Sequence, residues 1–148
     1  MATLSANAAT PPRRDPGSSK FEGTYKATGA DEYYVGSIVC HVSGKAILTN
    51  ADAAYTLGIC MQRTTVTAAD DPVKVHIAGI WWISCAQFAD ADLRLLAAPA
   101  AASDNPADLI IPGTGAVPGT LGMVVHIDVT GASGWLDLQQ RAADVNTA

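Results

Sequence analysis

The central part of the chain alternates between short apolar runs and polar links, a pattern typical of β-strands joined by turns. Residues 57–63, 73–77 and 80–85 form three such runs, and they are rich in Val, Ile, Thr and Trp, the residue types that favour strands. The link 64–72 ends in Ala-Ala-Asp-Asp-Pro, which predicts a turn because Asp accepts local backbone hydrogen bonds and Pro fixes its own φ. Gly79 separates the last two runs, where a bulge or sharp bend is expected. The pattern predicts a β-meander.

Regular alternation inside a run predicts which side chains share a face of the strand. Val73, Val75 and Ile77 are expected to share one face, with Lys74 and His76 turned away. The last long run follows the same rule and is expected to place four side chains on one face: Leu121, Met123, Val125 and Ile127.

Shorter runs on either side of the central segment predict further strands. Residues 34–42 and 45–48 are expected to form strands joined by a Ser-Gly turn, and residues 135–138 are expected to close the sheet. Residues 88–97 are ambiguous between a short helix capped by Asp90 and a turn followed by a strand. We favour the turn and strand.

A weak internal repeat links the middle of the chain to its end. Residues 55–62 align with residues 119–126, and Gly58 and Gly122 fall at the same position in the two copies. Each copy is followed by a turn and another apolar run. The match predicts two similar hairpins with pseudo-symmetry, although a chance match of this length stays open.

Two adjacent tryptophans stand out in the third run. Trp81 and Trp82 point to opposite faces if residues 80–85 form a strand. One ring can anchor the core, so the other must lie in a second layer, a ligand pocket or a contact between subunits, where aromatic side chains are enriched. Both tryptophans are therefore candidates for an oligomer interface.

The first 20 residues differ from the rest of the chain. They are small, polar and rich in proline, which predicts an arm that is disordered in the free protein. Arg13, Arg14 and Lys20 against Asp15 give the segment a charge of +2, while the whole chain carries −5, so the remainder carries −7. The arm could be a solvated tail, or it could become ordered on the acidic surface of a partner.

The 148 residues suit one domain, and 13 glycines with 8 prolines favour β-structure with many turns. We predict an all-β fold: a small single-domain barrel or sandwich, similar to a β-tulip, with a long Ala/Pro loop at 98–120. The expected parts are an extended N-terminal arm at 1–24, the β-rich domain at 25–139 and a C-terminal tail at 140–148.

Net charge, the length of the apolar runs and the cysteine content argue against several classes of protein. The net charge of −5 argues against nucleic acid as a partner. No apolar run approaches the roughly 20 residues that span a bilayer, and the N-terminus lacks the apolar core of a signal peptide. Three separate cysteines, without Cys-x-x-Cys spacing, are not a disulfide framework. They are expected to be buried and free, which favours synthesis in the cytosol.

Catalytic and metal-binding motifs are absent from the sequence. Residues 113–119 are rich in glycine but lack the Lys-Ser/Thr ending of a phosphate loop. His41, His76 and His126 fall one to a predicted strand, so surface positions are favoured over a zinc site. Cys60 could meet His76 across strands, but it has no activating cation nearby in sequence. We therefore predict no enzyme, no cofactor and no metal.

The order of these features resembles the small capsid cement, or head decoration, proteins of bacteriophages. The resemblance is carried by residues 33–48, 55–62, 73–80, 121–127 and 134–138. It implies a β-rich domain on the outer surface of an icosahedral phage head, present as a homotrimer and bound to the major capsid protein. It also implies that the protein is made in the host cytoplasm and resides in the virion.

In similar proteins the N-terminal arm lies on the shell, where it can add a strand to a sheet of a capsid subunit. The resemblance therefore makes five residues candidates for capsid binding: Arg13, Arg14, Lys20, Phe21 and Tyr25. It leaves Trp81 and Trp82 as the candidate oligomer interface. The alternative function is a small β-barrel that binds an apolar or sugar ligand near these two tryptophans.

Overall fold

The computed structural model describes residues 3–48, 55–100, 103–112, 119–128 and 132–139, and nearly all of its regular structure is β-strand. Within these ranges there is no α-helix, so the predicted all-β fold is confirmed. The elements in chain order are β1 (Arg13–Arg14), β2 (Glu22–Lys26), β3 (Asp31–Tyr33), β4 (Ile38–Val42), β5 (Lys45–Leu48), β6 (Tyr55–Ile59), β7 (Thr64–Val66), β8 (Pro72–His76), β9 (Ile80–Ser84), the 3-10 helix η1 (Asp90–Asp92), β10 (Leu96–Ala97), the 3-10 helix η2 (Pro106–Asp108), β11 (Gly122–Ile127) and β12 (Ser133–Asp137).

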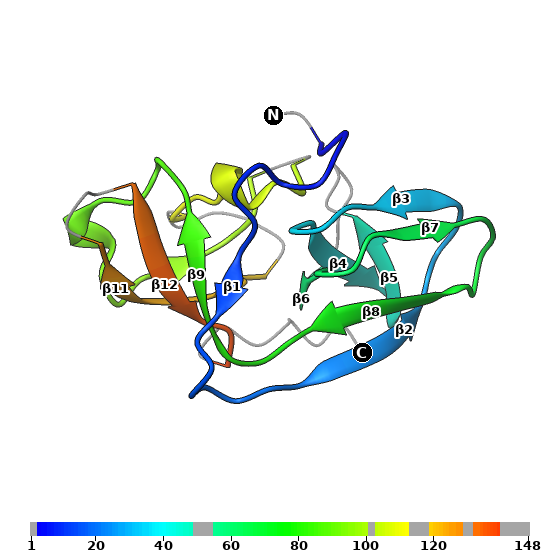
Figure 1. The fold of residues 1–148 in the computed structure, drawn as a ribbon, viewed down its shortest axis with the longest axis horizontal. Coiled ribbons are helices and arrows are strands. Elements are labelled where there is room, and N and C mark those ends of the chain that lie inside the picture. The colour runs from blue at the N-terminus through cyan, green and yellow to red at the C-terminus, as the bar shows by residue number, and fades with distance from the viewer. Residues whose placement is uncertain (1–2, 49–54, 101–102, 113–118, 129–131, 140–148) are drawn as a thin grey trace.

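The strands form two larger sheets and a short ribbon. Sheet A has the order β1-β9-β12-β11-β10, sheet B has the order β2-β8-β6-β4-β5, and β3 pairs with β7 as sheet C. The ladders between these strands are antiparallel. Figure 1 shows sheets A and B side by side, with the β3–β7 ribbon next to sheet B. β8 and β9 are consecutive in the chain, so the chain passes from sheet B to sheet A between them.

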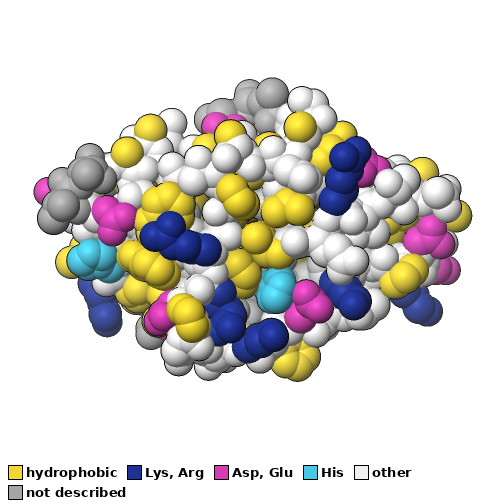
Figure 2. All heavy atoms as spheres, viewed as in Figure 1, with side chains coloured by type: hydrophobic (Ala, Val, Ile, Leu, Met, Phe, Trp, Pro, Cys, Tyr) yellow, Lys and Arg dark blue, Asp and Glu magenta, His cyan; other side chains and the backbone are white. Residues whose placement is uncertain are grey.

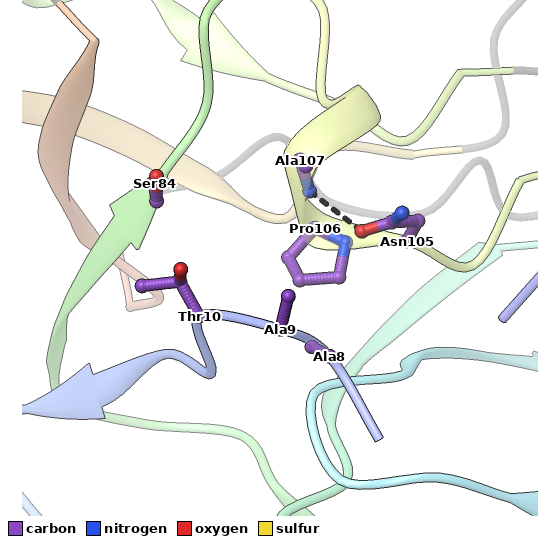
Figure 3. Close-up of a pocket in the computed structure, with 7 residues that line it drawn as sticks. All are labelled: Ala8, Ala9, Thr10, Ser84, Asn105, Pro106 and Ala107. Carbon is purple, nitrogen blue, oxygen red and sulfur yellow. Dashed lines mark hydrogen bonds between the residues drawn. The ribbon is translucent and has the colours of Figure 1, made fainter. Parts of the chain in front are cut away.

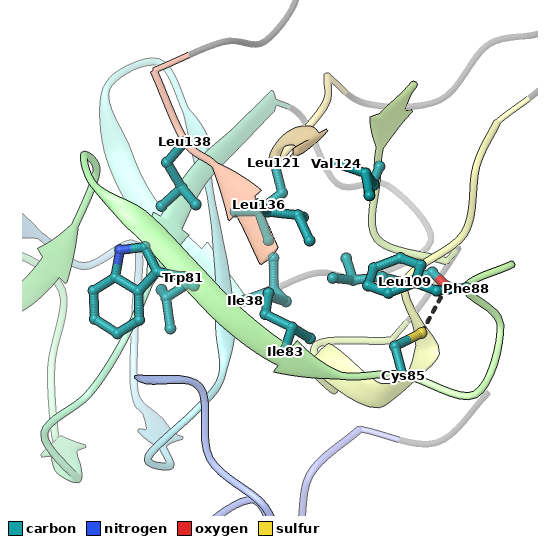
Figure 4. Packing of buried hydrophobic residues seen from close by; sticks show 12 residues of the cluster. Ile38, Trp81, Ile83, Cys85, Phe88, Leu109, Leu121, Val124, Leu136 and Leu138 are labelled. Atoms are coloured by element: carbon teal, nitrogen blue, oxygen red, sulfur yellow. Dashed lines mark hydrogen bonds between the residues drawn. The ribbon is translucent and has the colours of Figure 1, made fainter. Parts of the chain in front are cut away.

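Two clusters of buried side chains hold these layers together. In the first, Ile83, Val124 and Leu136 from the inner face of sheet A meet Ile38 and Ile59 from sheet B (Figure 4). Burying a side chain of this size stabilises the fold by about 1.5–3 kcal/mol. The second cluster fills the interior of sheet B and reaches sheet C; its members include Tyr33, Val39, Val66, Val73 and Val75. The first cluster is thus the contact that joins sheet A to sheet B.

Sheet B curls until its edges almost meet. An isolated parallel bridge joins Ala27, just after β2, to Ala46 of β5, and the backbone N–H of Thr28 donates to the carbonyl of Ala46 at 3.0 Å. The sheet is nevertheless not closed into a barrel, and a β-sandwich describes the architecture. The barrel alternative is therefore wrong, because one bridge does not continue the ladder around the sheet.

The two bends in the central meander form as predicted. The carboxylate of Asp71 accepts hydrogen bonds from the backbone N–H of Thr67 at 3.0 Å and of Ala68 at 3.2 Å, which closes the turn after β7. Gly79 has a φ of +104° and lies at the passage from sheet B to sheet A. Val73 and Val75 are fully buried, and Lys74 is exposed, which confirms the predicted faces of β8.

The predicted faces of the last long strand are wrong. Leu121 and Val124 are fully buried, whereas Met123 and Val125 are only half-buried. The pairing of β11 with β12 shifts between Val124 and His126. A bulge of this kind adds one residue to a strand and moves the following side chains to the other face, so strict alternation cannot hold.

Other elements differ from the prediction in extent. The strand expected at 34–42 begins only at Ile38, because Gly36, with a φ of +96°, turns the chain before it. The segment 88–97 forms one 3-10 turn at Asp90–Asp92 followed by β10, which confirms the order of a turn and then a strand. The strand was expected at residues 93–95 but begins only at Leu96. β1, β3 and β7 were not predicted, because each has only two or three residues and little apolar content.

The two copies of the internal repeat have equivalent structural roles. β6 and β11 each pair antiparallel with the next long strand of their sheet, β8 and β12. A Cβ on Gly58 would lie 2.0 Å from the carbonyl oxygen of His76, and a Cβ on Gly122 would lie 2.7 Å from that of Asp137. Each glycine thus allows the neighbouring backbone to approach closely, which supports a structural repeat.

The N-terminal arm lies on the domain, which corrects the prediction that it is disordered. The backbone N–H of Ala8 donates to the carbonyl of Val35 at 2.8 Å, and the side chain of Asn7 accepts from the backbone N–H of Val35 at 3.0 Å. Pro12 is buried, and β1 pairs with β9. These contacts use backbone groups and one proline, so the polar composition of the arm did not reveal them. The predicted tail at 140–148 lies outside the described residues.

Candidate functional site

The outer face of sheet A carries a row of large side chains, one from each of four strands. Arg13 of β1 is opposite Trp82 of β9, Trp82 is opposite Trp135 of β12, and Trp135 is opposite His126 of β11. Directly opposed residues in an antiparallel ladder project from the same face and contact one another. We call these four residues the aromatic row. Figure 2 shows hydrophobic side chains under a basic side chain on this part of the surface.

The arm contributes the cation at one end of the aromatic row. The guanidinium carbon of Arg13 lies 4.2 Å from the ring centroid of Trp82 and 5.6 Å from that of Trp135. A guanidinium at this distance is attracted by the electron-rich face of an indole, by about 0.5–1 kcal/mol at an exposed site. The stack therefore helps to hold β1 against β9.

An acidic side chain fixes the ring of Trp82 from the other side. Asp128 accepts a hydrogen bond from the indole Nε1 of Trp82 at 2.8 Å and another from the hydroxyl of Ser133 at 2.7 Å. The bond from Trp82, followed by that from Ser133, lowers the pKa of the Asp128 carboxyl. The nearest imidazole nitrogen of His126 is 3.8 Å from Asp128. The row is thus anchored by a carboxylate that stays ionised at neutral pH.

Trp81 points to the opposite face and belongs to the core. Only 3% of its surface is exposed, its indole N–H donates to the carbonyl of Ala78 at 3.0 Å, and its ring meets His76 edge-on at 5.1 Å. The prediction that one tryptophan anchors the core is confirmed. A buried Trp81 is not available to another subunit, so Trp82 is the tryptophan that remains a candidate for an interface.

The five candidate capsid-binding residues do not form one cluster. Arg13 lies in the aromatic row, while the guanidinium of Arg14 bonds the carbonyls of Asp15 at 3.0 Å and Ser18 at 2.8 Å. Lys20 and Phe21 are exposed. The fifth residue, Tyr25, is half-buried against the core of sheet B. The structure therefore separates Tyr25 from the others and adds four residues not predicted as site residues: His126, Asp128, Ser133 and Trp135.

The arm forms a loop between β1 and β2. This loop has more residues than the segment between β8 and β9 that lies beside it. The backbone N–H of Asp15 donates to the carbonyl of Ile80 at 2.8 Å, and that of Ile77 donates to the carbonyl of Phe21 at 3.1 Å. Residues 16–20 therefore lie opposite only Ala78 and Gly79 and bulge outward. We call residues 16–21 the tip loop. In Figure 1 the chain runs beside β9 before the tip loop, as β1, and beside β8 after the tip loop, as β2.

A small cavity of about 130 Å³ separates the arm from η2 (Figure 3). Its lining is small and uncharged: Ala8, Ala9, Thr10, Ser84, Asn105, Pro106 and Ala107. The side chain of Asn105 accepts a hydrogen bond from the backbone N–H of Ala107 at 3.0 Å and so is engaged within η2. None of the lining side chains titrates, so the cavity offers no acid–base chemistry.

The buried cysteines differ from catalytic ones. Burial raises the pKa of the Cys60 and Cys85 thiols, whereas a nucleophilic cysteine needs a lowered pKa. Cys60 donates to the carbonyl of Gln62 at 3.1 Å. Among the described residues, no group of three or more His, Cys, Asp or Glu side chains is arranged to hold a metal ion.

Asp104 fastens the beginning of the arm. Its side chain is fully buried and accepts a hydrogen bond from the backbone N–H of Leu4 at 2.7 Å, while its carbonyl accepts from the backbone N–H of Ile38 at 2.7 Å. Removal from water raises the pKa of the Asp104 carboxyl. The folded state therefore binds a proton here more tightly than the unfolded chain, in which the pKa of Asp is about 3.9.

This shift predicts a pH-dependent difference between the wild type and Asp104→Asn, which keeps an oxygen for the Leu4 amide. The contribution of Asp104 to stability is complete below the unfolded pKa and is lost as pH rises through the raised folded pKa. The free energy of unfolding of the variant, relative to wild type, should therefore increase from about pH 4 to about pH 7. Urea unfolding at several pH values measures it, and a difference that stays constant with pH would contradict the role given to Asp104.

The part of the chain that the structure describes holds no helix of the length and apolarity needed to cross a bilayer. Comparisons of the chain with protein-family models, with curated proteins and with solved structures found no match. The site is thus defined by its own geometry: an aromatic row and a tip loop that the N-terminal arm contributes to a β-sandwich.

Proposed function

We propose that this chain is a structural protein that decorates the outer surface of a phage capsid. In this proposal it binds the major capsid protein, acts as a homotrimer and resides in the virion after synthesis in the host cytoplasm. The observation that carries the proposal is the tip loop, which presents a cation and an aromatic ring at an outward bulge. The resemblance of the strand and turn segments to capsid decoration proteins supports the same role.

The tip loop has the properties of a preformed contact. Phe21 is 55% exposed although it is a large apolar residue, and Lys20 beside it is exposed too. The backbone on either side is held, because Asp15 bonds to Ile80 and Phe21 bonds to Ile77. A segment that is already ordered loses less conformational entropy on binding. The positive charge of the arm suits an acidic partner surface.

Substitution of the tip should weaken shell binding without disturbing the fold. We expect Lys20→Glu combined with Phe21→Ala to weaken binding to purified capsids by about tenfold or more, since loss of a central aromatic contact costs 2 kcal/mol or more at many interfaces. Co-sedimentation with capsids measures it. Lys45→Glu is the charge-matched control, because Lys45 lies on β5, outside the arm, and pairs with the exposed Asp70.

The control should bind like wild type. Equal binding by the double variant would remove the tip loop from the contact, and failure of the wild type to bind any capsid would end the decoration proposal. Deletion of residues 1–20 is a less clean test, because it would also remove β1 from the edge of β9 and Arg13 from Trp82.

A further inference from the structure

The edge of β9 is a binding site whose occupant is visible, because the arm of the chain fills it. Arg13 and Arg14 pair with Trp82 and Trp81, and the bond from Asp15 to Ile80 continues the contact by one residue. Strand addition of this kind uses backbone hydrogen bonds for affinity and side-chain contacts for specificity.

Two side-chain contacts make this site selective for a Pro-Arg pair. Pro12 is buried against Gly36: a Cβ on Gly36 would lie 3.3 Å from the proline ring and 2.7 Å from Ala8. Next to it, the guanidinium of Arg13 stacks on Trp82 and lies beside Trp135. A notch without a side chain thus receives the proline, and a pair of indole rings receives the cation.

The loop after β1 is held by local hydrogen bonds and by one bond to the domain. Ser18 donates through its N–H at 3.0 Å and through its hydroxyl at 2.8 Å to the carbonyl of Asp15, and its hydroxyl oxygen accepts from the backbone N–H of Ile80 at 2.9 Å. Residues 16–20 exceed the two residues opposite them, and five extended residues span up to about 17 Å. The arm can therefore leave its own domain without disturbing β2, provided that the bond from Ile80 to Ser18 breaks and residues 16–20 straighten.

Charge is compatible with a second copy as the source of the arm. The first 20 residues carry +2 and the rest of the chain carries −7, so the arm is attracted both to its own body and to the body of a neighbouring copy. Every copy carries the same Pro-Arg pair and the same receptor. A contact made between copies would then repeat the contact made within one, which is the condition for exchange of an element between subunits.

We propose that the β9 edge, the Gly36 notch and the Trp82–Trp135 pair form a receptor for an extended Pro-Arg segment, and that the arm of a second copy fills it in the assembled state. This proposal rests on the proposed function in one respect: a shell holds many copies close together. The effective concentration of sites linked in this way is of about millimolar order. Exchange itself is tested in solution without shells, so its failure is distinguishable from failure of the decoration role.

Complementary full-length variants test the exchange. Trp82→Ala leaves the arm intact but removes a ring of the receptor. Pro12→Ser combined with Arg13→Ala leaves the receptor intact but removes the Pro-Arg pair from the arm. We expect each variant alone to be monomeric by light scattering, and their mixture to form a hetero-oligomer at least about tenfold tighter than either self-association. Pro11→Ser with Arg13 intact is the matched arm control, since Pro11 is exposed. A mixture that behaves like its separate components would overturn the proposal.

The wild-type chain supplies a second measurement that depends on no substitution. Two differently tagged populations, incubated together at about 1 mM, should co-purify, and an excess of a synthetic peptide of residues 3–15 should reduce co-purification at least about tenfold. A peptide with Arg13 replaced by Ala should compete less well. Absence of co-purification, or co-purification that the peptide does not reduce, would overturn the exchange of arms.

Discussion

Replacement of Gly58 by alanine is expected to cost about 3 kcal/mol or more of folding stability, toward the upper end of the usual effect of overpacking. A Cβ at this position would lie 2.0 Å from the carbonyl oxygen and 2.9 Å from the carbonyl carbon of His76. Both groups belong to the backbone of β8, which is paired on both sides within sheet B. Relief would require the β6–β8 ladder to open. A domain stable by about 5–15 kcal/mol would lose a large fraction of its stability.

Urea unfolding followed by far-UV circular dichroism measures this loss. Gly29→Ala is the matched control, because a Cβ at Gly29 would meet no atom within 4 Å. The control should change the free energy of unfolding by less than about 0.5 kcal/mol, as is usual for surface substitutions. Similar unfolding midpoints for the two variants would show that β6 and β8 are not as close as the structure places them.

The second large effect is expected for Trp81→Ala, which should cost about 3–5 kcal/mol. Trp81 is 3% exposed and lies in the cluster that joins sheet A to sheet B. Truncation would leave a cavity beneath Ile83 and Leu136 and remove the hydrogen bond to Ala78. Because sheets A and B meet through this cluster, the loss should reduce their cooperation in unfolding as well as total stability.

Trp82→Ala provides the comparison within the same strand. Its ring lies on the outer face, so its removal should cost less, on the order of 1–2 kcal/mol from the lost stack with Arg13 and the lost bond to Asp128. It should also make the arm more sensitive to limited proteolysis after Arg13 or Arg14. Equal destabilisation by the two variants, or unchanged cleavage of the arm in Trp82→Ala, would contradict the assignment of the two faces.

The candidate site shows how far local sequence patterns extend. Adjacent tryptophans in a strand must point to opposite faces, so the division between a core ring and an outer ring followed from the sequence. Which ring is outside depended on the inner face of β9, where Trp81 joins Ile83. The partners of Trp82 come from residues 13, 128 and 135, and no local periodicity connects positions so far apart.

The arm shows a different limit. Composition indicated that residues 1–20 cannot form a core, and none of residues 3–20 belongs to either buried cluster. Their docking depends instead on a backbone edge left open by β9, on a notch at Gly36 and on a buried carboxyl at Asp104. Each of these belongs to another part of the chain. Disorder was predicted because the sequence of the arm indicates its polarity but not the distant residues that bind it.

The sequence by itself determined the all-β class, the turn at Asp71, the bend at Gly79 and the buried face of β8, because each depends on the conformational preferences or alternation of neighbouring residues. Only the tertiary structure decided the strand order, the bulge in β11, the open sandwich and the docking of the arm. These features depend on which backbone edges and which distant side chains meet. That choice is made by the packing of the whole domain.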